Sequence, residues 1–376
     1  MKIKINGNNY VFFNDFTFTQ NLDSVASSFS FTAKFDPENN VQKSFFRPLS
    51  FCKVEFFEDS GELFFTGVIV SHTFPSSAVS ELVTLSGYSL SGVIEDCTIP
   101  YSAYPLESNN RSLKEITERF IKPFGLKLIV ESSAKNDSNI VYSVTAAQPQ
   151  DKVKEYISKL SAQRNVVLTH NEKGNLVFFK PDFKGKPKVS YNSENTTAMS
   201  LEVNGQETHS ELTILRQPEK RKTEKKKKKQ KEEEGVDANG YPIESDPTPP
   251  SSPTPKKPKQ KPLYYDTIKN PLVLAYRPIV DVLTQGDATA TKNGAKNFLA
   301  DELKNIKFGI ELNRWDNLRA GDIVEIENAK LFIKGKVKLV VETLTKNENS
   351  DQKTMSINLV LPECFTGNAP KNIFLW

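Results

Sequence analysis

The chain has 376 residues, which allows about two or three domains of ordinary size. Its 50 basic and 46 acidic residues leave a net charge of +4, so the folded parts offer no strong attraction to a polyanion. Cys52, Cys97 and Cys364 lie far apart, which argues against a disulfide scaffold or a zinc site and suits a reducing compartment. We expect neither a signal peptide nor a transmembrane segment, because no apolar run has the required length.

The first hundred residues alternate between apolar and polar side chains. In SFSFTAKF, apolar and polar residues occupy opposite parities, so Phe29, Phe31, Ala33 and Phe35 share one face. Similar runs follow in YVFFNDFTFTQ, where Phe12, Phe16 and Phe18 share a parity, and in CKVEFFE, ELFFTGVIVSHTF and ELVTLSGYSL. These runs predict a β-barrel-like domain with an aromatic core over residues 1–104.

The periodicity becomes helical after residue 104. Ser112 and Glu115 form a predicted capping box, and a helical face follows in Leu113, Ile116, Phe120, Ile121 and Phe124. A second helix in DKVKEYISKLSAQRN precedes the hairpin VVLTHNEKGNLVFFK, which turns at residues 171–175. We therefore expect a small α+β domain over residues 105–200.

Strand-like runs return from residue 201 and continue to SINLVLPECF. They predict a second β-barrel-like domain over residues 201–366, followed by a tail at 367–376. One helix is expected near residues 289–306, with the apolar face Ala295, Phe298, Leu299, Leu303 and Ile306. The predicted fold class is α+β, mainly β, with two barrel-like domains flanking the α+β domain. No sequence repeat is visible between the two β parts.

Residues 218–262 form a Lys- and Pro-rich block inside the second β domain. Nine basic residues stand against five glutamates between residues 219 and 234, and eight prolines follow between 242 and 262. This composition predicts a long disordered insertion that forms no core. The alternative is a nucleic-acid-binding arm, but Tyr241 is the only aromatic residue between positions 216 and 262 that could stack on a base.

No residue pattern indicates a reaction. His72, His170 and His209 lie at no metal-ligand spacing, and we expect them to be structural. In SGVIEDC, Glu95 and Asp96 would point to opposite faces of an expected strand, which suits no acid and base pair. Cys97 has no neighbouring cation to lower its pKa. We therefore predict no catalytic, cofactor-binding or metal site, and no cofactor.

Six segments, in this order, resemble one family, the baseplate hub proteins of contractile, Mu-like phage tails. The segments are GYSLSGVIEDCTIP, SLKEITERFIKPFGLKL, EYISKLSAQRNVVLTHNEKGNLVFFKP, SLEVNGQETHSELTILRQ, RPIVDVLTQGDATATKNGAKNFLADEL, and NRWDNLRAGDIVEIENAKLFIKGKVKLVVETLT with MSINLVLPECF. The chain departs from the family in its long block at 218–262 and in a shortened loop around Trp315.

The resemblance implies a structural, non-enzymatic protein of the virion tail, assembled in the host cytoplasm. It implies a homotrimer whose two β domains per chain imitate six-fold symmetry. This homotrimer joins a tail tube protein to a central spike protein, with other baseplate proteins as further candidate partners and no small-molecule substrate. Phage, bacteriocin and secretion devices share these parts, and the sequence does not separate them. A hydrolase fused to a hub would need a further domain, for which we expect no room after the last strand.

Two questions stay open at this stage. The block at 218–262 is expected to lie outside the ring. The apolar tail at residues 372–376, NIFLW, is either a docking peptide for a neighbouring protein or a last strand that covers the β domain.

Overall fold

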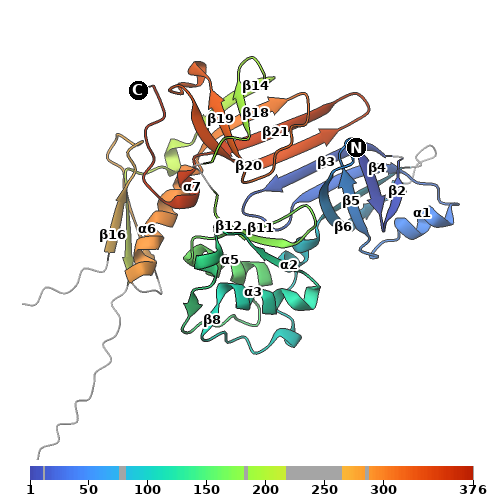
Figure 1. The fold of residues 1–376 in the computed structure, drawn as a ribbon, viewed down its shortest axis with the longest axis horizontal. Helices are drawn as coiled ribbons and strands as arrows, with labels where there is room; N and C mark the ends of the chain where they lie inside the picture. The colour runs from blue at the N-terminus through green and yellow to red at the C-terminus, as the bar shows by residue number, and fades with distance from the viewer. Residues whose placement is uncertain (12, 76–81, 182–184, 217–264, 284–287, 376) are drawn as a thin grey trace, which may run out of the picture.

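The computed structural model describes residues 1–11, 13–75, 82–181, 185–216, 265–283 and 288–375. The predicted block at 218–262 and Phe12 lie outside the described residues. Figure 1 shows a long twisted sheet that carries both ends of the chain, with a helical unit beneath it and a small sheet with a helix at one side.

The N-terminal lobe is formed by the first seven strands and a short helix, α1 (Asn40–Phe45). The strands are β1 (Lys2–Ile5), β2 (Asn8–Tyr10), β3 (Phe13–Asn21), β4 (Ser28–Lys34), β5 (Lys53–Phe57), β6 (Leu63–Thr73) and β7 (Leu82–Ser89). The expected alternation is confirmed in β4, where Phe29, Phe31 and Ala33 are buried and the polar residues between them are more exposed. The rings of Phe29, Phe31, Phe56 and Phe65 contact one another in the edge-on and stacked arrangements that aromatic pairs favour.

The middle unit follows directly. Its helices are α2 (Val93–Asp96), α3 (Leu113–Ile121), α4 (Lys135–Ser138) and α5 (Val153–Gln163), and its strands are β8 (Arg111–Ser112), β9 (Leu128–Val130), β10 (Val141–Tyr142), β11 (Val167–His170) and β12 (Leu176–Phe179). The predicted capping box is present, because the Ser112 hydroxyl accepts from the Glu115 amide and the Glu115 carboxylate accepts from the Ser112 amide. The unit has its own apolar core, to which α3 and α5 contribute Phe120 and Tyr156.

One expected strand in this region is a helix. The segment SGVIEDC was expected to be extended, but it forms a short 3₁₀ turn, η1 (Leu90–Gly92), followed by α2. The helical turn places Ile94 in the core of the middle unit, whereas the local sequence shows only a short mixed run.

The C-terminal lobe contains the remaining long strands. They are β13 (Val189–Asn192), β14 (Ala198–Val203), β18 (Ile306–Leu312), β19 (Ile323–Glu327), β20 (Val337–Glu348) and β21 (Lys353–Val360), followed by α7 (Glu363–Thr366). A side unit interrupts this lobe after β14. It consists of β15 (Glu211–Arg216), β16 (Tyr265–Lys269), β17 (Pro278–Leu283) and α6 (Ala288–Leu303).

The helix expected near residues 289–306 is therefore present as α6, but Ile306 is not part of it. Leu299 and Leu303 lie on its buried side as predicted, whereas Ile306 begins β18 and is buried as a strand residue. Apolar residues at helical spacing continued across the turn, so the pattern did not mark the end of the helix.

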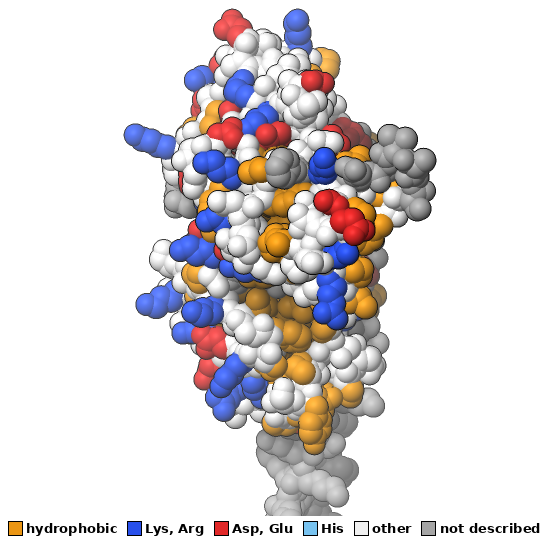
Figure 2. All heavy atoms as spheres, turned by 90° about the vertical axis from the view of Figure 1, so that its right-hand side faces the viewer, with side chains coloured by type: hydrophobic (Ala, Val, Ile, Leu, Met, Phe, Trp, Pro, Cys, Tyr) orange, Lys and Arg blue, Asp and Glu red, His pale blue; other side chains and the backbone are white. Residues whose placement is uncertain are grey.

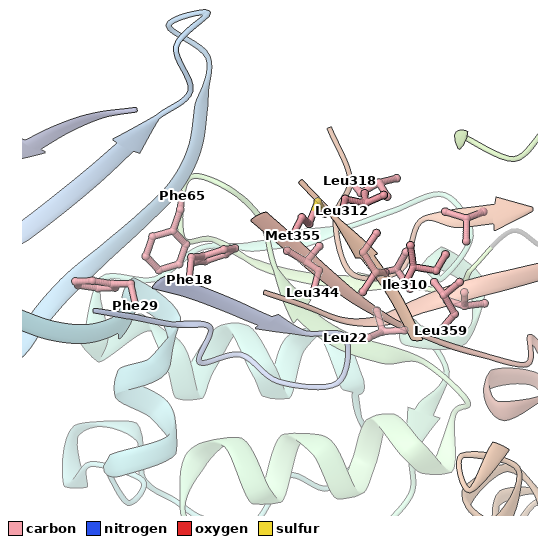
Figure 3. Packing of buried hydrophobic residues seen from close by; sticks show 14 of the residues in the cluster. Phe18, Leu22, Phe29, Phe65, Ile310, Leu312, Leu318, Leu344, Met355 and Leu359 are labelled. Carbon is pink, nitrogen blue, oxygen red and sulfur yellow. The ribbon is translucent and has the colours of Figure 1, made fainter. Parts of the chain in front are cut away.

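The mainly β class with a small α+β unit is confirmed, but the described strands close no barrel. The two lobes instead share one sheet of 13 strands, in the order β14-β18-β21-β20-β3-β4-β7-β6-β5-β1-β2, with β19 and β13 branching from β20. One apolar core runs through both lobes, and Figure 3 shows Phe18, Phe29 and Phe65 of the N-terminal lobe in a layer that continues to Leu344 and Met355. The expected domain boundaries at residues 104 and 200 stay predictions.

The two lobes have the same strand topology. The N-terminal lobe has the order β3-β4-β7-β6-β5-β1 and the C-terminal lobe the order β14-β18-β21-β20-β19-β13. When the extra edge strand β2 and the side-unit strands are left out, each position is filled by the strand of the same rank along the chain. Neighbouring pairs are antiparallel in both lobes, except that β13 runs parallel to β19 whereas β1 runs antiparallel to β5. The lobes are therefore two versions of one β module, although no repeat was visible in the sequence.

A β-bulge marks the same place in both lobes. Val70 is the extra residue in β6 opposite β7, and Glu342 is the extra residue in β20 opposite β21. Because the registers agree on both sides of the bulge, residues of the two lobes can be matched one by one. Ser71 then corresponds to Thr343, and Gly87 to Leu359.

Gly87 tests how tightly β6 and β7 pack beside the bulge. A β-carbon at Gly87 would lie 1.9 Å from the carbonyl oxygen of Val68, so Gly87→Ala should lower the free energy of unfolding by about 1–3 kcal/mol. The matched control is Gly309→Ala in β18, where the added carbon would meet the Ser200 hydroxyl, which can rotate away. Chemical denaturation of both variants measures the difference, and equal losses would contradict the close packing.

Candidate assembly site

The junction between the lobes is an antiparallel strand pair. β3 of the N-terminal lobe pairs with the second half of β20, from Asn21 opposite Thr343 to Phe16 opposite Glu348. The backbone amide of Leu22 continues this contact by donating to the Glu342 carbonyl over 2.8 Å. The strand pair therefore joins the two lobes into a single continuous sheet.

Side chains reinforce this strand pair along its length. Thr343 donates to the Asn21 side-chain oxygen over 2.7 Å, and the Thr19 and Thr345 hydroxyls are 3.1 Å apart. Cross-strand hydroxyl pairs of this kind stabilise antiparallel strands modestly. They also fix which residues face each other, because a slip by one residue would break each of them.

Lys346 is buried at the centre of the junction. Only 3% of Lys346 is exposed, its ammonium lies 2.9 Å from Glu58, and it stands over the rings of Phe64 and Trp315 at 4.9 and 5.3 Å. Burial lowers the pKa of Lys346, and the Glu58 carboxylate opposes this effect. Glu58 and Phe64 belong to the N-terminal lobe, so the charge is neutralised only when the lobes are joined.

Trp315 closes the same junction from the loop between β18 and β19. Its ring packs on Phe16 and Phe64 at centroid distances of 6.0 Å, and its indole N–H donates to the carbonyl oxygens of Asn347 and Thr354. The loop around Trp315 therefore lies across both lobes and covers the paired strands.

A cluster of charges lies at the rim of the junction. Asp59, in the turn between β5 and β6, contacts the amino-terminal group of Met1 and the ammonium of Lys353 on β21. Lys353 and the terminal amine lower the pKa of Asp59 to about 2. The carboxylate is 69% exposed, so its contribution is reduced by solvent and salt.

The middle unit is attached to the N-terminal lobe by buried polar groups. His170 Nε2 lies 2.6 Å from the Ser27 hydroxyl, and burial lowers the pKa of this imidazole. A cavity of about 750 Å³ opens where the middle unit meets both lobes. Its charged lining residues include Lys346 and Arg319, which pair with Glu58 and Glu172.

The other residues considered from the sequence are not brought together. His209, in the segment between β14 and β15, pairs with Glu302 of α6 over 2.5 Å. His72 stacks on Phe74 at the end of β6. Glu95 contacts Lys154, while Asp96 accepts a hydrogen bond from Tyr88. Within the described ranges, no three His, Cys, Asp or Glu residues group as metal ligands would, and the absence of a catalytic site stays a prediction.

The carboxyl-terminal tail lies on the C-terminal lobe. Phe374 is 6% exposed and pairs with Ile333, and the Leu375 amide donates to the Phe332 carbonyl over 2.8 Å. These contacts favour the covering strand over the docking peptide. Trp376 lies outside the described residues.

The ends of the predicted insertion meet at one place. The chain leaves β15 at Arg216 and returns in β16, and these strands pair antiparallel with Leu215 opposite Tyr265. The side unit therefore needs no contribution from residues 217–264 to bring β15 and β16 together. In the described part of the chain, no helix is long and apolar enough to cross a membrane.

Sequence reasoning missed the junction residues. Lys346 and Glu58 lie in separate strand-like runs, and nothing local to either run indicates their pairing. The shortened loop around Trp315 was noted, but its contact with the N-terminal lobe was not expected.

The first variant tests the buried charge at the junction. Glu58→Gln should lower the free energy of unfolding by about 3 kcal/mol, because it leaves the Lys346 ammonium buried without a counter-ion. The double variant Glu58→Gln with Lys346→Met should recover part of this loss, as measured by chemical denaturation. Full stability of Glu58→Gln alone would show that Lys346 does not depend on its partner.

The second test uses acid pH. The folded pKa of Asp59 lies below its ordinary value of 3.8, so its stabilising contribution is complete above about pH 4 and is lost as the pH falls towards 2. Asp59→Asn should therefore destabilise the protein at pH 5 and have little effect near pH 2, in urea melts at low salt. Asp351→Asn, in the nearby turn between β20 and β21, is the control, and an Asp59→Asn effect that does not depend on pH would refute the assignment.

The comparisons with known proteins agree with this architecture. Residues 91–180 match the family model for the second domain of gp44-like baseplate hub proteins. No curated protein sequence matches the chain.

Solved structures that share the fold over the whole chain include two phage tail proteins and a secretion component. The 43 kDa tail protein of prophage MuSo2 from Shewanella oneidensis has a TM-score of 0.73 at 18% identity, over 96% of this chain and 98% of that one. The tail protein from Neisseria meningitidis MC58 has a TM-score of 0.71 at 17% identity, over 98% of each chain. The E. coli c3393 protein, a type VI secretion component described as similar to the T4 tail proteins gp27 and gp5, has a TM-score of 0.54 at 9% identity, over 99% of this chain and 80% of that one.

Proposed function

We propose that this chain, which carries a gp44-like baseplate hub domain at residues 91–180 and the fold of phage tail proteins throughout, is the structural hub of a phage tail or tail-like injection machine. It acts as a ring of three copies that adapts a six-fold tail tube to a three-fold central spike. The observation that carries the proposal is the repeated topology of the two lobes.

Two like modules per chain resolve a symmetry mismatch. Three copies present six similar lobes, and these can match a tube with six equivalent subunits on one side. The lobes still differ in sequence and in their attachments, since the middle unit follows the N-terminal lobe and the side unit interrupts the C-terminal lobe. The same ring can therefore present three-fold symmetry to a spike on the other side.

The partners follow from this role. We propose a homotrimer that contacts a tail tube protein and a central spike protein, within a virion baseplate assembled in the host cytoplasm. Support for a spike partner comes from a chain of the Francisella PdpA-VgrG complex, which has this fold with a TM-score of 0.52 at 8% identity over 98% of this chain and 58% of that one. No enzymatic activity is part of the proposal.

The insertion provides a sharp test of this role. Because β15 and β16 pair at their ends without it, deletion of residues 219–261 should leave a protein that still forms trimers, as measured by light scattering after size exclusion. Loss of the trimer in the shortened, folded protein would contradict the proposal that the insertion lies outside the ring.

The same two proteins separate the hub from a nucleic-acid-binding protein. A hub should show weak DNA binding that vanishes with the insertion, while its mass remains that of three chains. A monomer that binds DNA tightly through residues 219–261, with affinity falling steeply as the salt concentration rises, would refute the hub proposal. It would instead support a nucleic-acid-binding protein that uses the insertion as its binding arm.

A further inference from the structure

Besides the outer edges of β2 and β13, two strand edges in the sheet have no neighbouring strand among the described residues. β14 pairs with β18 on one side only, and Val203 at its end is 52% exposed. On the β5 side of β6, the last contact is the Ile69 amide, which donates to the Cys52 carbonyl over 2.9 Å, and residues 70–74 continue beyond it. Open edges of this kind offer unpaired amides and carbonyls to another strand.

Each of these edges corresponds to one that is paired at the junction. β14 occupies the position in its lobe that β3 occupies in the other, and β6 corresponds to β20. In β20 the matching amide, that of Val341, donates to the Asp322 carbonyl over 3.0 Å, and the residues beyond the bulge then pair with β3. The free edges are thus the two halves of a second junction that one chain cannot form with itself.

We propose that β14 of one copy pairs antiparallel with residues 70–74 of a second copy, in the register that β3 and β20 use within the chain. The matched residues place Ser71 opposite Asn204, His72 opposite Val203 and Thr73 opposite Glu202. This inference rests on the proposed hub, and it names the contact through which the copies join.

The side chains suit this register. The Thr343 and Asn21 hydrogen bond would be reproduced by the Ser71 hydroxyl and the Asn204 side-chain oxygen. The Thr19 and Thr345 pair would become Thr73 with Glu202, a hydroxyl donor facing a carboxylate acceptor. In this register the backbone amide of Gly205 takes the place of the Leu22 amide. Within the chain, the Leu22 amide donates to the carbonyl of Glu342, the bulged residue of β20.

The loop between β4 and β5 provides a second observation. It corresponds to the loop between β18 and β19, which packs on the N-terminal lobe through Trp315 and Gly321. In the N-terminal lobe the loop presents Leu49 at 79% exposure and Phe51 at 56%, both with left-handed backbone angles, φ 61° and 49°. Exposed apolar side chains on strained backbone are typical of a surface that is covered in the assembly.

Figure 2 faces the end of the molecule that carries β2, β5 and α1, and shows exposed hydrophobic side chains gathered on this face. Val41, Leu49 and Phe51 of the loop between β4 and β5 are exposed residues of this lobe. We assign the covering partner of Leu49 and Phe51 to the C-terminal lobe of the next copy, next to its β14. Each copy then uses β14 for one neighbour and β6 for the other, and three copies close a ring in which chain-internal and intersubunit junctions alternate.

Disulfide trapping tests the register directly. Thr19→Cys with Thr345→Cys is the matched internal control, because the two side chains face each other within the chain. Thr73→Cys with Glu202→Cys is the corresponding intersubunit pair and should give covalent two-chain and three-chain bands after mild oxidation. Thr73→Cys with Val203→Cys should give none, because neighbouring strand residues point to opposite faces. Oxidised wild-type protein accounts for the native thiols.

The outcomes separate this inference from the proposed function. The proposed register is wrong if the protein is trimeric and the internal cysteine pair oxidises, but the cysteines at Thr73 and Glu202 do not. It is also wrong if the chains link through the cysteine at Val203 instead. Either result leaves the hub proposal intact. A chain that stays monomeric at all concentrations overturns both. Covalent trimers that form with the Thr73→Cys and Glu202→Cys double variant, but not with the Thr73→Cys and Val203→Cys double variant, support both the register and the hub.

A second variant tests the loop without altering the strands. Leu49→Asp should raise the concentration at which trimers dissociate by at least tenfold. The thermal unfolding of the single chain should stay unchanged, because Leu49 is exposed in the single chain. Leu274→Asp, which changes an 88% exposed residue of the side unit, is the control and should leave the trimer unchanged. Equal behaviour of the two variants would contradict the covering contact.

Discussion

Backbone pairing between β3 and β20 is the contact on which this structure depends. Asn21 and Thr343, which face each other there, are 322 positions apart in the chain. This one strand pair converts two β modules into a single sheet with a shared core. It also brings Glu58 to the buried ammonium of Lys346, so the charge at the junction is neutralised only in the joined form.

A contact between like modules constrains the rest of the assembly. Once β3 of one module pairs with the edge of β20 in the other, the corresponding edges, those of β14 and of the end of β6, are left open in matching geometry. A heterologous contact that repeats in this way either closes into a ring or grows without limit. The side unit and the middle unit lie beside the long sheet and leave its strand order unbroken (Figure 1), so the proposed ring contacts do not require them.

Local features were readable from the sequence because they arise from neighbouring residues. The capping box of Ser112 and Glu115 and the alternation of β4 depend on spacings of three and two residues, and both are present. The pairing of β3 with β20 leaves no local signal, and the matching lobes have diverged so far that Gly87 stands where Leu359 stands in the other. The helix α2 and the end of α6 at Leu303 were set by burial in the core, which overrode the short-range pattern.

The most direct test of the account is a reconstruction of the assembled particle by electron microscopy, with the chain-internal and intersubunit junctions compared after superposition. The account predicts a three-chain ring of six similar lobes, in which the intersubunit contact superposes on the β3 and β20 junction, bulge included. A ring whose chains meet through the middle unit or the side unit, with β14 left open, would contradict it.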